Sequence, residues 1–212
     1  AREARSLLSD EEVFLAPGLA RELKEKKTPI EDMSADSIIT IGGDGTVLYT
    51  LQKAPETPIL GINMGAKGFL ADINPEEVPK AIKKMINGEL EIKERERLSV
   101  EVSGEKLGTA LNEGVIRSKE ALRVLSLRII LDGEVIEEIR GDGLIVSTPT
   151  GSTAYALSAG GPIVDPRVQA FIAVPLNTHR PMAMPLVYPM TSKLEVKLLD
   201  SDREADVIVD GQ

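Results

Sequence analysis

Gly141–Pro162 reads GDGLIVSTPTGSTAYALSAGGP, and the chemistry of this stretch changes abruptly along its length. The short apolar run 144–146 predicts a buried strand. Five of the seven residues that follow, Ser147–Thr153, carry a hydroxyl group, and Pro149 and Gly151 disfavour regular structure there. Small residues come next and let a ligand approach the backbone closely. This composition indicates a wall that hydrogen-bonds a polar ligand; the alternative is a Ser/Thr-rich turn between two strands.

The overall composition limits the classes of function. Of the 212 residues, 42% are hydrophobic and 28% charged, and the net charge is −9. A negative net charge argues against general nucleic-acid binding, which needs a basic face, although backbone N–H groups can still hold a phosphate. No apolar run approaches the roughly 18 residues of a membrane span. Cysteine is absent, which fits a reducing compartment. We therefore expect a cytoplasmic protein without nucleic-acid or membrane partners.

A strand predicted over Ser37–Ile41 leads directly into a glycine turn, Gly42–Thr46, with the sequence GGDGT. A helix is predicted over 47–53, because Pro55 stops it. A strand, a glycine turn and a helix N-terminus direct free N–H groups at one point, as in the anion sites of α/β proteins. Asp44 would repel a phosphate there unless it takes a proton or faces a metal ion. We interpret Asp44 as a functional carboxylate; the alternative is that it only caps the helix.

The two common nucleotide-binding motifs are absent from the sequence. No glycine loop closes with Gly-Lys-Ser or Gly-Lys-Thr, and the GGDGT turn lacks the spacing of a dinucleotide fingerprint. A second buried strand over 59–63 and a proline-initiated helix from 74–77 onward complete a βαβα pattern. The first 90 or so residues therefore predict a parallel sheet with helices.

From residue 96 onward the hydrophobic pattern is that of strands. Apolar residues alternate with polar ones at Leu98, Val100 and Val102, and again at Leu125, Leu127 and Ile129. The pair Asp132–Gly133 predicts a tight hairpin turn. We therefore predict an α/β domain over residues 1–95, which carries the GGDG motif, and a β-rich, antiparallel, sandwich-like domain over residues 96–212.

Two further polar positions in the second half bear on function. Asn112 and Glu113 follow an apolar stretch. Asn can donate and accept at once, and Glu can accept from paired hydroxyls, which suits an adenine edge and a ribose; a plain turn is the alternative. His179 is the only histidine. A histidine-based triad and a multi-histidine metal site are therefore excluded, and we interpret His179 as structural.

Taken together, these motifs resemble those of the NAD kinases, which phosphorylate NAD to NADP. Gly42–Thr46 matches the family's Gly-Gly-Asp-Gly motif, and Asn112–Glu113 matches its short Asn-acid motif. Gly141–Pro162 is similar to the family's long glycine- and threonine-rich motif almost residue for residue. Ile62–Leu70 and Asp210–Gln212 also fit. The first motif is shared with diacylglycerol- and sphingosine-type lipid kinases, whereas the long motif is specific.

The resemblance spans residues 37 to 212, and it implies an α/β domain, a β-rich domain and a site between them. It implies that Asp44 is the catalytic base, which takes the proton from the 2′-hydroxyl of the adenosine ribose. Gly45 would hold phosphate through its N–H group, and Asn112 and Glu113 would hold base and ribose. The other binding residues that it implies are Arg123, Arg140, Asp142, Thr153, Ala154, Tyr155, Ala156, Leu157, Ser158 and Gln212.

The resemblance also implies the reactants. ATP, or polyphosphate, would be the phosphoryl donor, and Mg²⁺ would bind mainly through the donor and offset its charge. A homo-oligomer, dimer or tetramer, is implied, in which a neighbouring subunit completes the pocket. Two alternatives stay open: a lipid kinase that uses the same Asp44, and a non-catalytic NAD(P)-binding module. The sequence does not rank ATP against polyphosphate or NAD against NADH. Family members normally extend further at both ends, so we expect segments beyond Ala1 and Gln212.

Overall fold

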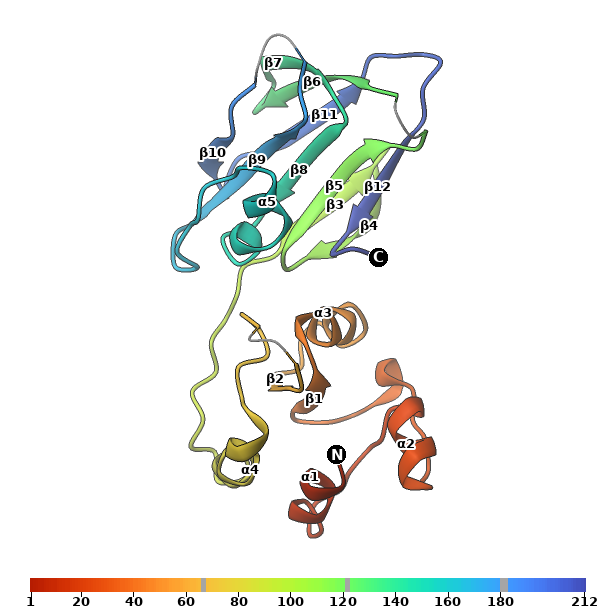
Figure 1. Ribbon diagram of the computed structural model, residues 1–212, viewed down its shortest axis with the longest axis vertical. Coiled ribbons are helices and arrows are strands. Elements are labelled where there is room, and N and C mark those ends of the chain that lie inside the picture. Colours follow the sequence, from red (N-terminus) through yellow and green to blue (C-terminus); the bar gives the residue numbers. More distant parts are fainter. Residues whose placement is uncertain (66–67, 121–122, 180–182) are drawn as a thin grey trace. The chain divides into compact units, whose positions relative to one another are not determined.

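The computed structural model describes residues 1–65, 68–120, 123–179 and 183–212. These residues form two compact units, Ala1–Lys93 and Glu94–Gln212. Helices dominate the first unit and strands the second (Figure 1). The fold is therefore an N-terminal α/β unit with a parallel sheet, followed by an antiparallel β-rich unit, as the sequence predicts. The assignment of separate functions to residues 1–95 and 96–212 stays a prediction.

The first unit is built on two parallel strands, β1 (Ile38–Gly42) and β2 (Ile59–Asn63), which are joined by helix α3 (Asp44–Lys53). Helix α4 (Val78–Ile86) follows β2, which confirms the predicted βαβα order. The other elements are α1 (Arg2–Leu7), α2 (Pro17–Leu23) and the 3-10 helices η1 (Ile30–Asp32) and η2 (Pro75–Glu77). The sequence analysis does not predict α1.

A small apolar core holds this unit together. Val78 and Ile82 of α4 pack against Ile62 of β2 and Ala4 of α1. The chain enters α4 through a capping box, in which Asn74 and Glu77 satisfy each other's backbone N–H groups. This local signal is the one that the sequence shows most clearly, and it sets where the helical segment begins.

The second unit contains three antiparallel sheets. The five-stranded sheet has the order β10-β9-β8-β5-β12, the three-stranded sheet has the order β11-β6-β7, and β3 and β4 form a pair. The strands are β3 (Leu98–Val102), β4 (Glu105–Ala110), β5 (Glu113–Ser118), β6 (Leu125–Leu131), β7 (Glu134–Gly141), β8 (Gly143–Ser147), β9 (Ala170–Leu176), β10 (Leu186–Pro189), β11 (Leu194–Leu198) and β12 (Ala205–Val209).

The five-stranded sheet is covered on both faces. One face packs against the three-stranded sheet through Leu127, Leu144 and Phe171. The other packs Ile145 and Ile172 against Ala156 of the short helix α5 (Tyr155–Ser158), which follows the 3-10 helix η3 (Gly151–Thr153). Strands β8 and β9 are therefore buried along nearly their whole length, and within them only Val146 and Pro175 are partly exposed.

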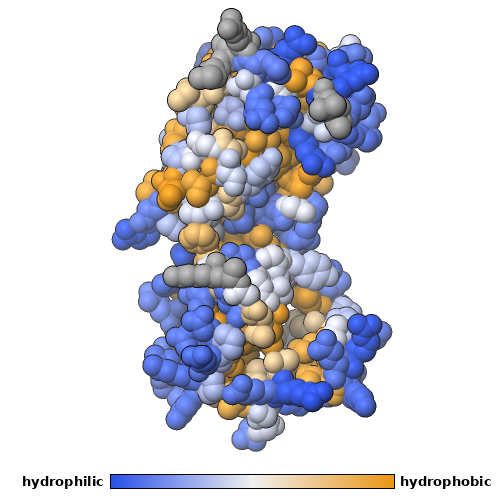
Figure 2. Space-filling model, in the orientation of Figure 1, coloured by the Kyte–Doolittle hydropathy of each residue, from blue (hydrophilic) through white to orange (hydrophobic). Residues whose placement is uncertain are grey.

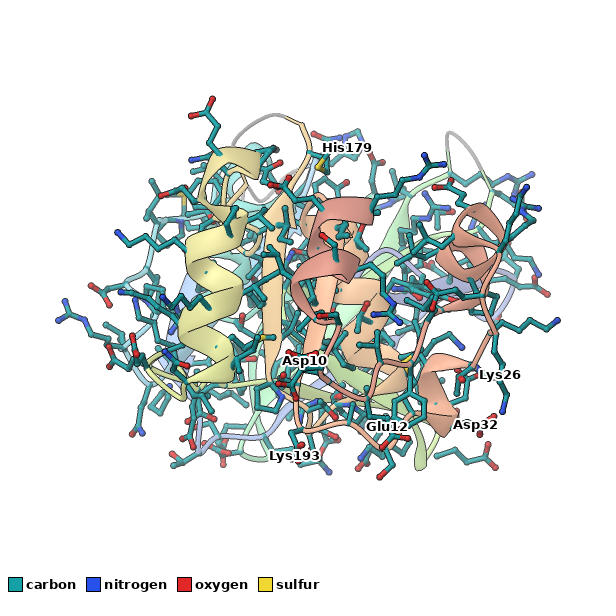
Figure 3. The ribbon with its side chains drawn as sticks, turned by 90° about the horizontal axis from the view of Figure 1, so that it is seen from below. Asp10, Glu12, Lys26, Asp32, His179 and Lys193 are labelled. Atoms are coloured by element: carbon teal, nitrogen blue, oxygen red, sulfur yellow. The ribbon has the colours of Figure 1, made fainter. Side chains whose placement is uncertain are left out.

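The β6–β7 hairpin turn is the one predicted from the sequence. Asp132 and Gly133 have φ values of 50° and 90°, as a two-residue type I′ turn requires. Across the described ranges, no helix is long and apolar enough to cross a membrane. The exposed charges include Asp10, Glu12 and Lys26, and the single histidine, His179, is also exposed (Figure 3).

Candidate functional site

Asp44 is held by the backbone of a distant segment. Its carboxylate accepts hydrogen bonds from the N–H groups of Phe69, Leu70 and Ala71, at 2.8, 3.0 and 3.0 Å. The N-cap residue of α3 is Gly43, which has no side chain with which to cap the helix. The helix begins at Asp44, three residues before the predicted start. The alternative that Asp44 only caps this helix is therefore wrong.

Glycines surround this carboxylate for a steric reason. A Cβ atom added to Gly68 would overlap Oδ1 of Asp44, whereas one added to Gly65 would meet nothing within 4 Å. The same holds for Gly45, which is exposed and has no atom within 4 Å of an added Cβ. Gly68 therefore lets the chain close over Asp44, and Gly45 leaves the start of α3 open to a ligand.

A second carboxylate holds the chain segment Leu111–Glu113, which we name the β5 corner because β5 begins at its last residue. Asp210 accepts hydrogen bonds from the N–H groups of Leu111, Asn112 and Glu113, at 2.8, 2.8 and 3.1 Å. Its own N–H donates to the carbonyl of Glu113 at 3.0 Å. The corner is thus fixed by one side chain, and Glu113 opens a central strand instead of lying in a plain turn.

The hydroxyl-rich stretch fixes the same corner from the other side. The Thr148 hydroxyl donates to the carbonyl of Leu111, and the Ser147 hydroxyl and the Thr148 N–H donate to the carbonyl of Asn112. An added Cβ at Gly151 would overlap the backbone of Asn112. Ser147, Thr148 and Ser152 are fully buried. For these three hydroxyls the predicted ligand-binding wall is wrong, because they bond to backbone.

The side chain of Glu113 lies in an unusual environment. It is 8% exposed, and its Oε2 atom has no hydrogen-bond partner among the described residues. Burial, and next the negative charge of Asp210, raise the pKa of Glu113 from 4.5 to about 7, while a backbone hydrogen bond from Tyr155 lowers it. A buried carboxyl with one free oxygen is suited to a ligand that brings its own hydroxyl donors.

Asp142, Arg123 and Arg128 each have a defined side-chain partner. The Asp142 carboxylate accepts from Asn177 Nδ2 at 2.9 Å, and it is exposed. Arg123 pairs with Glu120 at 2.8 Å. Arg128 pairs with Glu138 at 2.7 Å.

The residues predicted around α5 fall into two groups. The side chain of Ala156 is wholly buried in the core, so it can offer a ligand only its backbone. Thr153 and Ala154 are half-buried. The exposed members of the set are Tyr155, Leu157, Ser158 and Gln212. The exposed side chains and the β5 corner lie in the same unit, whereas Asp44 and Gly45 belong to the other.

Across the described ranges, no three acidic or histidine side chains gather where they could hold a metal ion. A Mg²⁺ ion bound mainly through donor phosphates needs only one or two protein oxygen ligands. The single carboxylates of Asp44 and Asp142 fit a Mg²⁺ ion that is bound mainly through the donor phosphates. They do not form a metal site made of protein ligands alone.

Family comparisons cover almost the whole chain. Residues 9–90 match the ATP-NAD kinase N-terminal domain, and residues 111–212 match the ATP-NAD kinase C-terminal domain. A NAD kinase from Methanothermobacter thermautotrophicus is 47% identical over 193 residues, which cover 90% of this chain and 68% of that protein. A NAD kinase from Methanoregula boonei is 44% identical over 201 residues, covering 94% and 74%.

Two solved structures are similar to this chain. Yeast NADH kinase in complex with NADH has a TM-score of 0.84 and 28% identity, and the match covers 99% of this chain and 71% of that one. A NAD kinase from Archaeoglobus fulgidus in complex with ATP has a TM-score of 0.76 and 35% identity, with 92% and 78% covered.

Proposed function

This chain belongs to the NAD kinase family, and we propose that it transfers the γ-phosphoryl group of ATP to the 2′-hydroxyl of the adenosine ribose of NAD, giving NADP. The observation that carries this proposal is the match to both family domains in order, with the motif residues held as described above. ATP as donor is supported by the A. fulgidus complex, and a dinucleotide acceptor by the yeast complex.

The roles of individual residues follow from their chemistry. Asp44 is the base that takes the proton from the 2′-hydroxyl, and three N–H donors fix the position of its carboxylate. Gly45 contributes its N–H at the start of α3, where the helix dipole favours phosphate. Asn112 hydrogen-bonds the base, and the free oxygen of Glu113 accepts from ribose hydroxyls.

The remaining predicted residues bind the rest of the dinucleotide in this proposal. Arg140 and Asp142 flank Gly141 at the β7–β8 connection, where an exposed Asp142 can accept from a carboxamide. Arg123 lies on the same unit and is exposed. The α5 group contributes exposed Tyr155, Leu157, Ser158 and Gln212, half-buried Thr153 and Ala154, and the backbone of Ala156.

Phosphoryl transfer requires little covalent chemistry from a protein. The enzyme must place the hydroxyl in line with the phosphorus atom and stabilise the charge that develops. Mg²⁺ bound to the donor phosphates would neutralise part of that charge. Asp44 then supplies proton removal, and the chain's N–H groups supply orientation.

We also propose that the active form is a homo-oligomer, a dimer or a tetramer. The second unit exposes several large apolar side chains, visible as orange atoms on its surface in Figure 2. The exposed large apolar residues of this unit include Ile163 (68% exposed), Val168 (47%) and Val187 (48%). Burying them against another subunit would be favourable at about 25 cal/mol per Å². A cytoplasmic location is proposed from the absence of cysteine and from the substrates.

A labelled-phosphate assay tests the proposed function. With γ-labelled ATP and Mg²⁺, we expect label to appear in NADP when NAD is the acceptor, and none in lipid when diacylglycerol or sphingosine vesicles are offered. Label in lipid alone would support a lipid kinase. NAD binding without transfer, measured by calorimetry alongside, would support a non-catalytic module. Replacing ATP by polyphosphate, and NAD by NADH, ranks the donors and acceptors.

A further inference from the structure

We propose that Asp210 is a positioning residue for NAD binding: its carboxylate fixes the backbone of the β5 corner and thereby aims the side chains of Asn112 and Glu113. The inference rests on the proposed function, because it assumes that these two side chains contact NAD. Sequence reasoning gives Asp210 no role, since it appears there only as part of a motif match next to Gln212.

The hydrogen bonds at Asp210 require a side chain with two acceptor oxygens. Oδ2 accepts from the N–H of Leu111, and Oδ1 accepts from those of Asn112 and Glu113. The residue is 7% exposed. A carboxylate is acceptor-only when ionised and can serve all three donors at once. Three charge-assisted bonds to consecutive amides leave the corner no freedom to turn.

The pairing of β12 with β5 places Asp210 next to the β5 corner. Strand β12 pairs antiparallel with β5, and its last residue, Val209, lies opposite Gly114. The chain then turns at Asp210, whose φ is 48°, a conformation that Asp tolerates better than most residues. The donors to the carbonyls of Leu111 and Asn112 come from Ser147 and Thr148 at the end of β8. The β5 corner is therefore hydrogen-bonded by residues at the ends of both strands that pair with β5, namely β12 and β8.

The charge of Asp210 has a second consequence for Glu113. The groups that bear on the Glu113 carboxyl are Asp210 beyond β12 and the backbone N–H of Tyr155 in α5; on β8 the residue opposite Glu113 is Ser147, which is neutral. Burial raises the pKa of Glu113 most, the negative charge of Asp210 raises it further, and the Tyr155 N–H lowers it. An ionised Glu113 accepts from ribose hydroxyls, so the charge of Asp210 also shifts the pH range in which NAD binds.

The test compares NAD affinity by calorimetry between pH 5.5 and 8.5 in three proteins: wild type, Asp210→Asn and Asp206→Asn. The asparagine keeps the size of Asp210, but it removes the charge and turns one oxygen into a donor that faces an N–H group. We expect Asp210→Asn to weaken NAD binding about 10–100-fold, and to move the pH midpoint of binding to lower pH. Asp206→Asn removes the same charge from β12, the strand that leads into Asp210, and is expected to leave both quantities unchanged.

The outcomes separate this inference from the proposed function. Wild-type protein that neither binds nor phosphorylates NAD overturns the proposed function, and the inference with it. Wild-type activity together with an unchanged affinity and pH midpoint in Asp210→Asn overturns the inference alone. A loss of affinity with an unmoved pH midpoint assigns Asp210 a purely structural role and overturns the second part of the proposal.

Amide hydrogen exchange of the wild-type protein provides a measurement that needs no variant to fold. We expect the amides of Leu111, Asn112 and Glu113 to exchange slowly in the absence of NAD, because Asp210 already holds them. Exchange at the rate of exposed loop amides would contradict the positioning role. Slow exchange supports the positioning role. In a separate kinetic measurement on Asp210→Asn, a kcat at saturating NAD within about threefold of wild type also supports it.

Discussion

Asp44→Asn is expected to lower kcat about 10²–10⁴-fold, the usual contribution of a general base. The amide has the size of the carboxylate but cannot take the proton of the 2′-hydroxyl. The KM for NAD should change little, because an interaction made only in the transition state is removed. Steady-state kinetics of NADP formation, with NAD affinity measured by calorimetry, checks both quantities.

The structure shows what must be controlled in this experiment. Asn has one acceptor oxygen, so its Nδ2 group would face at least one of the three N–H donors from Phe69, Leu70 and Ala71. A displaced loop would also lower activity. Such displacement should appear as a raised KM and a lower melting temperature, whereas loss of the base should appear in kcat alone. A kcat near that of wild type would contradict the assignment of Asp44.

Gly68→Ala tests the same placement without changing the carboxylate, and Gly65→Ala is its matched control. The methyl group at residue 68 would overlap Asp44 Oδ1, whereas the methyl group at residue 65 enters open space. We expect Gly68→Ala to reduce kcat and Gly65→Ala to leave it close to wild type.

Glu113→Gln is expected to give the largest effect on stability. The folded-state pKa of Glu113, about 7, is above the ordinary value of 4.5, so the folded protein binds more protons than the unfolded one between these values. The contribution of Glu113 to stability is therefore full below pH 4.5 and is lost as the pH rises through about 7. Above pH 7 the loss amounts to at most about 3 kcal/mol.

The measurement is the free energy of unfolding of both proteins, by denaturant titration in the absence of NAD, from pH 4 to 8. Relative to wild type, Glu113→Gln should gain stability as the pH rises and reach a plateau above pH 7. The control is Glu105→Gln, which removes an exposed carboxylate from β4 of the same unit. A pH-independent difference between wild type and Glu113→Gln would mean that Glu113 titrates normally.

Much of the fold is predictable because its signals are local. The capping box at Asn74–Glu77, the Asp132–Gly133 turn and the alternation in β3 and β6 each depend on neighbours in the sequence. The GGDG turn is visible for the same reason, although the start of α3 is not. The helix begins at Asp44, and the side chain of Asp44 bonds to a loop 25 residues further on instead of capping the helix.

The part of the site that is not predictable depends on long-range pairing. Asp210 meets Leu111 across 99 residues, and nothing in the sequence near residue 210 indicates that contact. The hydroxyls of Ser147 and Thr148 look like ligand groups in sequence, yet the pairing of β5 with β8 brings them to backbone carbonyls. Burial of a polar side chain is decided by which strands become neighbours, and the sequence does not state this.

The central claim is that this chain phosphorylates NAD on the adenosine ribose, and the ³¹P NMR spectrum of the product tests it most directly. The protein is incubated with NAD, ATP and Mg²⁺, and the nucleotides are then separated. The account predicts one new phosphomonoester signal, coupled to the proton on the 2′ carbon, with one ADP formed per NAD consumed. A phosphate at any other hydroxyl, or ADP formation with NAD unchanged, would contradict it.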